Sequence, residues 1–312
     1  ALLPGRPSLQ LAIAWANCLL QRADEAQTAL DHVHAAFDGD LDQLGQGIVG
    51  EADVLQACID VYCDRIDRAA ELVAPFLVPR PTARPFLLAV AANILTFVDI
   101  HTFDYDGALQ RQRSAAPFHA STSGPFAGVY GRCFAGLAAF AKLDLTTAER
   151  MYQEALALAR ATAGQRSHAA RLASALLGRV RYERGDIDGA EQLLEACHEL
   201  GAESGVVEFM VDTYITLARI KTLRGDVDGA WSLLEEGVDA ASQLRLPRLL
   251  AAIELEQVRL HLALGETTRA SDVVSRAGGD DLLGTDGIAV ATHDFQAMMR
   301  ARVLTAAERF DG

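Results

Sequence analysis

One alanine recurs at a nearly fixed interval along the whole chain. The seven positions are Ala26, Ala69, Ala108, Ala148, Ala190, Ala230 and Ala270, an interval of about 40 residues. The residues around the alanine repeat most clearly late in the chain: RGDIDGAEQLLE at 184–195 returns as RGDVDGAWSLLE at 224–235, and more loosely as LGETTRASDVV at 264–274. A repeat of this length is typical of helical hairpins that stack on their neighbours.

Each late repeat predicts the same local structure. Gly225 is expected to end one helix, because glycine adopts the left-handed backbone that closes helices, and Asp226 is expected to cap the next. Ala230 and Leu234 then lie on the buried face of that second helix. The two helices of a hairpin approach most closely near their turn, where only a methyl group fits. Larger side chains there overpack the core.

The repeat therefore predicts an all-α fold, a right-handed superhelix of about seven to eight stacked helical hairpins. Such a tetratricopeptide-like α-α solenoid can run through residues 1–312 as one domain. Glycine- or proline-rich stretches at 39–50, 75–85, 117–125 and 278–287 are expected to connect hairpins, and a last helix is expected at 288–309.

Composition excludes several classes of protein. The net charge of −14 would repel a phosphate backbone, so no direct nucleic-acid contact is expected. No apolar run is long enough to span a membrane. An odd count of cysteines in apolar helical surroundings predicts free thiols in a reducing compartment, hence a cytoplasmic protein. The five are Cys18, Cys58, Cys63, Cys133 and Cys197.

The sequence offers no pattern for catalysis or metal binding. It contains no GxxxxGK phosphate loop, no GxGxxG after a strand and no HExxH. The paired carboxylates Asp186 with Asp188, and Asp226 with Asp228, recur at the same repeat position, where helix capping explains them. We therefore expect no catalytic residue, no metal site and no enzymatic activity in this chain.

A column of arginines is the candidate ligand-binding site. Arg179, Arg219 and Arg259 lie 40 residues apart on the first helices of successive hairpins, which are expected to line the inner groove. Guanidinium groups suit a carboxylate, phosphate or polyhydroxylated ligand. The alternative is bridging within or between repeats, for instance from Arg179 to Glu183. Three further candidates on the same helices are Tyr182, Asp212 and Tyr214.

Particular segments carry a family resemblance. The opening contains Arg6-Pro7, Ala14-Trp15 and Asp24-Glu25-Ala26, and the late repeats are followed by an LPRL connector within 244–266. In these features, and over nearly its whole length, the chain resembles the helical sensor region of the MalT-type, ATP-dependent regulators of the LuxR family.

The resemblance implies an effector-sensing and self-association domain of a larger transcription regulator. The expected partners are a small-molecule inducer and a second copy of the chain or a regulatory protein. ATP is expected on an N-terminal nucleotide-binding module outside this segment, which itself needs no cofactor. DNA binding would belong to a helix-turn-helix that is also outside it. The alternative is a tetratricopeptide-like scaffold that binds a peptide or partner protein. A closed pocket would favour the sensor and an open channel the scaffold.

Overall fold

The computed structural model confirms the all-α class. It describes residues 6–20, 22–37, 43–76, 84–122, 124–164, 167–201, 205–277 and 287–308, and these contain helices and turns but no strand. Contacts divide the chain into two compact units. Unit 1 is Ala1–Leu177 with Glu203–Val206, and unit 2 is Gly178–Ala202 with Val207–Gly312. That the whole chain acts as a single domain stays a prediction.

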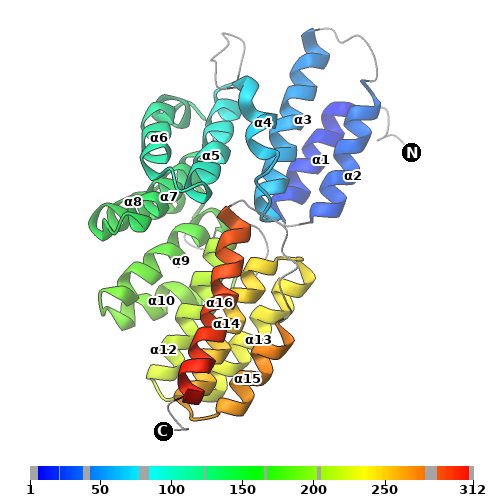
Figure 1. Cartoon of the computed structure of the whole chain (residues 1–312). Helices are drawn as coiled ribbons and strands as arrows, with labels where there is room; N and C mark the ends of the chain where they lie inside the picture. Colours follow the sequence, from blue (N-terminus) through cyan, green and yellow to red (C-terminus); the bar gives the residue numbers. More distant parts are fainter. Residues whose placement is uncertain are drawn as a thin grey trace. The chain divides into compact units, whose positions relative to one another are not determined.

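The helices pair in chain order (Figure 1), as α1 with α2, α5 with α6 and α7 with α8 illustrate. The first helices of the successive hairpins are α1 (Pro7–Leu19), α3 (Gln43–Tyr62), α5 (Pro85–His101), α7 (Pro125–Ala141), α9 (His168–Glu183), the run α11 (Val207–Val211), η2 (Asp212–Thr216) and α12 (Leu217–Leu223), and α14 (Pro247–Ala263). The second helices are α2 (Ala23–Ala35), α4 (Ala69–Val73) with the short turn η1 (Ala74–Phe76), α6 (Tyr105–Ala120), α8 (Leu145–Ala163), α10 (Ile187–His198), α13 (Val227–Gln243) and α15 (Thr267–Arg276). A final helix, α16 (Gly287–Glu308), packs on α14 and α15, and its bounds confirm the predicted last helix.

The repeated alanine occupies the predicted place. All seven alanines have 0% of their surface exposed, and each lies within the first turn of a second helix. Because a methyl is the largest group that such a closely packed point accepts, the alanine allows the two helices of each hairpin to touch. The register read from the sequence is thus confirmed in both units.

The helix caps also follow the repeat. The carboxylates of Asp186 and Asp226 accept hydrogen bonds from Gly189 N (3.1 Å) and Gly229 N (2.9 Å), which confirms the capping interpretation of the two acidic pairs. Asp144 and Asp104 do the same one and two repeats before Asp186, accepting from Thr147 N and Gly107 N. Each such cap stabilises its helix by about 1 kcal/mol.

From the second hairpin on, the turn inside each hairpin has a left-handed residue five positions before the alanine. It is Gly185, Gly225 or Gly265 in the late repeats, with φ of 81°, 82° and 76°. Earlier repeats have the same backbone without glycine, at Asp64, Phe103 and Leu143. The turn geometry is therefore conserved within this chain even where glycine is not, and the non-glycine residues bear the strain.

Two expected connections are partly helical: the described part of 39–50 belongs to a helix, and in the 117–125 stretch only 121–124 connects α6 to α7. The described part of the 39–50 stretch belongs to α3, where Gly50 leaves room for Phe76, since a Cβ at Gly50 would lie 3.3 Å from its ring. Pro117 lies inside α6 rather than in a connection. Proline leaves the carbonyl of Arg113 without its helical donor, but both residues are exposed, so water can satisfy that oxygen. Most of the 75–85 and 278–287 stretches lies outside the described residues.

Two further expectations concern the cysteine thiols and the lack of a membrane-spanning segment. All five cysteines are free, as predicted; Cys18, Cys133 and Cys197 are buried and the other two are half-buried. Within the residues the structure describes, no helix combines the length and the apolar character needed to cross a bilayer.

We predict that Leu143→Gly stabilises the protein by about 1 kcal/mol, because glycine removes the left-handed strain. Leu143 has φ of 63° and is 84% exposed, so little packing is lost. Gly225→Leu should lower stability by a similar amount. Leu264→Gly is the control, since Leu264 is an exposed turn leucine with φ of −88° and should gain nothing. Urea denaturation measures all three; a less stable Leu143→Gly protein would contradict the repeated turn geometry.

Candidate functional site

The predicted arginine column lies in unit 2 and is neutralised by acidic side chains. Arg179 on α9 donates from Nη1 to Asp212 Oδ1 of η2 (2.8 Å). Arg219 on α12 donates from Nε and Nη2 to Glu256 Oε2 of α14 (3.0 and 2.8 Å). Arg259 reaches the other oxygen of the same carboxylate at 2.5 Å. The column therefore bridges successive hairpins through carboxylates that the sequence analysis did not pair with it.

The acidic partners are more deeply buried than the arginines. Asp212 is 4% exposed and Glu256 2% exposed, whereas the guanidinium groups remain partly open to solvent. Burial raises the pKa of Asp212 to about 6, and this outweighs the opposing effect of Arg179. Charges removed from water in this way are stable only when paired, so these arginines are required by the carboxylates beside them.

Tyr182 and Tyr214 differ in their surroundings. Tyr214 is buried in η2, where its ring lies 3.1 Å from the position a Cβ on Gly237 would take and 6.2 Å, centroid to centroid, from His198. Tyr182 is half-buried and lies within electrostatic range of Arg219. Tyr182 thus shares surroundings with the column, whereas Tyr214 packs in the core. A ligand-binding role for the six candidates stays a prediction.

The sequence analysis missed one further bridge in unit 2. Arg248 Nη2 donates to Glu208 Oε1 at 2.8 Å, and both side chains are largely buried. These residues are 40 positions apart, the repeat length, so equivalent positions with opposite charge could have revealed the pair. It joins α11 to α14, beside the Arg219–Glu256 bridge that joins α12 to α14.

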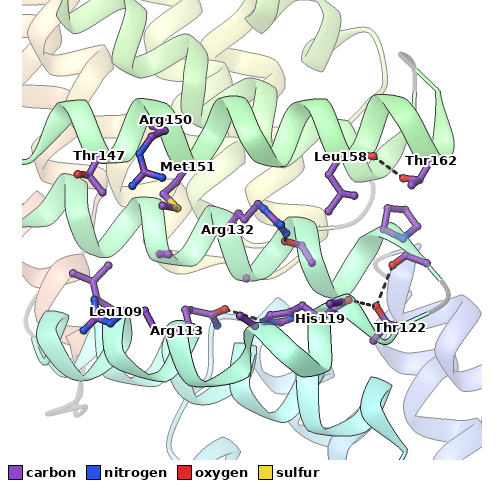
Figure 2. Close-up of a pocket in the computed structure, with 18 of the residues that line it drawn as sticks. Leu109, Arg113, His119, Thr122, Arg132, Thr147, Arg150, Met151, Leu158 and Thr162 are labelled. Carbon is purple, nitrogen blue, oxygen red and sulfur yellow. Dashed lines mark hydrogen bonds between the residues drawn. The ribbon is translucent and has the colours of Figure 1, made fainter.

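A half-open hollow in unit 1 lies among α6, α7 and α8 (Figure 2) and has a volume of about 940 Å³. Arg113 and His119 come from α6, Arg132 from α7, and Arg150 and Met151 from α8. The cavity thus lies where the third hairpin meets the fourth. Its size is in the range that accepts a small organic ligand.

Glycines and alanines form part of the wall on α7 and α6. Gly128, Gly131 and Ala135 follow one another along the face of α7 that borders the cavity, and Ala116 and Ala120 face it from α6. Neighbouring side chains approach the glycines closely: a Cβ at Gly128 would lie 3.1 Å from Leu158, and one at Gly131 would lie 2.5 Å from Gln112 Oε1. The three- and four-residue spacing on α7 was visible in the sequence and could have indicated a helix face without large side chains. It could not have shown which side chains of α6 and α8 lie against that face.

A polar network underlies one end of the cavity. Thr96 donates its hydroxyl hydrogen to Ala92 O, so its oxygen accepts from Gln112 Nε2 (2.7 and 2.8 Å). Gln112 Nε2 also donates to Asn93 Oδ1 (3.0 Å), which leaves Gln112 Oε1 facing His119 Nε2 at 3.0 Å. Gln112 is therefore an acceptor toward His119, and the histidine donates from Nε2.

His119 is consequently held neutral. Burial, with a contribution from the nearby Arg132, lowers the pKa of His119 to about 4. Its Nδ1 is buried without a hydrogen-bond partner among the described residues, so a second proton on the ring would have no acceptor. The network therefore presents a neutral imidazole, and the positive charge at this cavity comes from the arginines.

We predict that Glu256→Gln lowers the free energy of unfolding by about 1–3 kcal/mol, because both Arg219 and Arg259 lose their carboxylate. Arg259→Gln should cost less than about 1 kcal/mol, since Arg219 still neutralises Glu256. Urea denaturation near neutral pH measures both variants. Equal losses would contradict the shared carboxylate.

His119 should make stability fall in mild acid. Its folded pKa is lower than the ordinary value, so the stabilisation is complete above about pH 6.5 and is lost as the pH falls toward 4. Between about pH 7 and pH 5 we expect a loss of about 2 kcal/mol that His119→Gln lacks, because glutamine keeps an N–H for Gln112 and does not titrate. Denaturation of the two proteins at both pH values checks this. Parallel losses would show that His119 is not held neutral.

Comparison with known proteins agrees with the fold. The profile of the family described as MalT-like TPR region matches residues 50–311. Serine/threonine-protein kinase PknK of Mycobacterium tuberculosis and of Mycobacterium bovis is 36% identical over 308 residues, 98% of this chain. The chain spans 27% of the length of these curated relatives.

Solved structures show the same fold at low identity. The apo form of RapI has a TM-score of 0.55 at 9% identity, covering 97% of this chain and 99% of RapI. NprR in complex with its cognate peptide NprX has a TM-score of 0.54 at 12% identity, covering 96% and 82%. These similarities are evidence of architecture alone. Since the family match extends over most of the sequence, this chain belongs to the MalT-like TPR family.

Proposed function

We propose that this chain is the effector-sensing and self-association domain of a larger signalling protein of the LuxR-regulator type, and that a small-molecule inducer binds the cavity among α6, α7 and α8. The cavity of about 940 Å³ is the observation that carries the proposal. Membership of the MalT-like family supports it. Recognition, rather than catalysis, is the function we assign.

The position of the cavity suggests how binding is transmitted. It touches α6 of the third hairpin and both α7 and α8 of the fourth. A ligand there contacts two repeats at once and favours the stacking angle at which both sets of contacts form. By mass action it shifts the population toward that state, provided that it binds the state more tightly than the alternative. Self-association would follow where the favoured state exposes a complementary surface.

The rest of the protein decides what is regulated. The PknK relatives are about four times as long as this chain, and their name describes a kinase. We propose that ATP and any kinase or DNA-binding function belong to regions outside this chain. The net charge of −14 supports the absence of direct nucleic-acid contact, and a cytoplasmic location is part of the same proposal.

A second candidate function is a scaffold that binds a peptide. Two structural neighbours favour it: NprR, solved with its peptide NprX, and the Rap conjugation gene regulator of plasmid pLS20, solved with the Phr* peptide. The latter has a TM-score of 0.52 at 11% identity, covering 93% of this chain and 85% of the regulator. In this function a peptide, rather than a metabolite, would be the effector.

Thermal unfolding with two libraries, small metabolites and short peptides, distinguishes these functions. A ligand that binds the folded state at a concentration of 100 Kd stabilises it by about 2.7 kcal/mol. Ala116 is exposed and faces the cavity, so Ala116→Phe places an aromatic ring in part of it with little effect on the core. Ala301→Phe, an exposed position on α16, is the control.

We expect at least one metabolite to raise Tm in the wild type and in Ala301→Phe, but not in Ala116→Phe. Stabilisation by peptides alone, unaffected by Ala116→Phe, would replace the sensor with the scaffold. No stabilisation by either library would overturn both functions.

A further inference from the structure

We propose that the cavity among α6, α7 and α8 selects an organic anion, a carboxylate or phosphate carried on an apolar body, through Arg113 and Arg132. This inference rests on the proposed function, since it names the class of ligand for the same cavity. It follows from two observations on one hollow. Its walls are largely apolar, and they carry cationic side chains whose charge is not fully neutralised by nearby carboxylates.

The hydrogen-bond partners of Arg113 and Arg132 are neutral. Arg113 donates from Nε and Nη2 to the amide oxygen of Gln110 (3.1 and 2.9 Å). Arg132 donates from Nη1 to the backbone oxygen of Gly128 (2.9 Å), and its Nε lies 4.0 Å from Glu154 Oε2. Neither guanidinium is thus hydrogen-bonded to a carboxylate of the described residues. Each retains donors that match the geometry of a carboxylate or phosphate.

Arg150 is better compensated and has a smaller part. Its Nη1 donates to Glu154 Oε1 at 3.0 Å, and Asp144, the acidic residue in the described cavity lining, lies close enough for Arg150 to help lower the pKa of that carboxyl. The chief cause of that lower pKa is the hydrogen bonding of Asp144 with Thr147 at the start of α8. Arg150 therefore attracts an anion at long range, but its guanidinium does not offer a free pair of N–H donors to bind that anion.

The contrast with unit 2 supports the assignment. There Arg179, Arg219 and Arg259 are each ion-paired with a buried carboxylate, so their charge is used within the fold. In a chain of net charge −14, two arginines on one cavity without such partners are a local excess of positive charge. Low-dielectric walls strengthen the attraction of such a site for an anion.

The walls indicate that the anion is attached to an apolar group. Leu109, Met151 and Leu158 border the cavity together with the alanines and glycines of α6 and α7 (Figure 2). The volume is far larger than a bare phosphate or acetate would fill. His119 contributes a neutral ring, which the apolar body can contact without a charge penalty.

A pair of fluorescent dyes tests the inference. Anilinonaphthalene sulfonate is an amphipathic anion, and phenylnaphthylamine has the same aromatic body without the charge. The folded chain should bind the anionic dye at least about tenfold more tightly than the neutral dye. Circular dichroism at each titration end point verifies that the protein remains folded.

Three substitutions and one control variant locate the bound dye. Arg113→Gln and Arg132→Gln should each weaken binding of the anionic dye by about tenfold and leave the neutral dye unchanged. Arg160→Gln is the matched control. Arg160 is exposed on α8 and is not among the residues that line the cavity, and its substitution changes the net charge by the same amount. Its effect on the affinity for the anionic dye should therefore stay below about twofold. Ala116→Phe should abolish binding of both dyes.

The outcomes separate this inference from the proposed function. If both dyes bind equally, the arginine variants have no effect and Ala116→Phe abolishes both, the cavity binds ligands but is not selective for anions. If the anionic dye does not bind, or if Ala116→Phe leaves its binding unchanged, the anion site is overturned. Competition for the anionic dye by octanoate, octyl phosphate and octanol then identifies the head group. Displacement of the dye by octanoate points to a carboxylate, and displacement by octyl phosphate points to a phosphate. Equal displacement by octanol overturns the inference.

Discussion

The close approach of two helices beside each turn is the constraint on which the rest of the structure depends. A fully buried alanine in the first turn of the second helix, five residues after a left-handed residue, recurs in hairpins of both units. This pairing sets the geometry within a hairpin, and it is local in sequence. Packing between hairpins is left to other residues, for example Gly131 of α7, which Gln112 of α6 covers, and Gly237 of α13, which Ile253 of α14 covers. Those contacts need not repeat, so each joint can differ.

This division explains what the sequence could predict. The alanines, the caps at Asp186 and Asp226 and the turn glycines are local, and all were predictable from spacing. The partners of the arginine column were not, because Asp212 and Glu256 lie 33 and 37 residues from the arginines they meet, and neither interval is the repeat. The π-helical turn η2, which holds Asp212, also alters the helical register there. The cavity could not be predicted for a similar reason. The small residues of α7 would form the same sequence pattern if side chains of α6 had filled the space beside them.

The two sets of arginines show that residue type alone does not assign a role. Arg219 and Arg132 both lie on first helices, one per unit. The first meets a buried carboxylate from the next hairpin. The second donates to a backbone oxygen, and its Nε lies 4.0 Å from the exposed carboxylate of Glu154. A guanidinium beside a buried carboxylate is a structural requirement, because removing it would leave an uncompensated charge out of water. A guanidinium beside a neutral oxygen keeps its long-range attraction for an anion.

A joint with a cavity is also the place where a repeat protein can respond to a ligand. Within each hairpin the buried alanine leaves little freedom, since even one added methylene would overpack the contact. Between the third and fourth hairpins, α7 packs on both α5 and α6, and the hollow opens beside these contacts. A ligand in the hollow would add contacts in one stacking arrangement and not in others, which is the differential affinity that a switch requires. Under the proposed function the same joint could act within proteins whose other regions differ, because the signal would be a change in the stacking of helices rather than a chemical step.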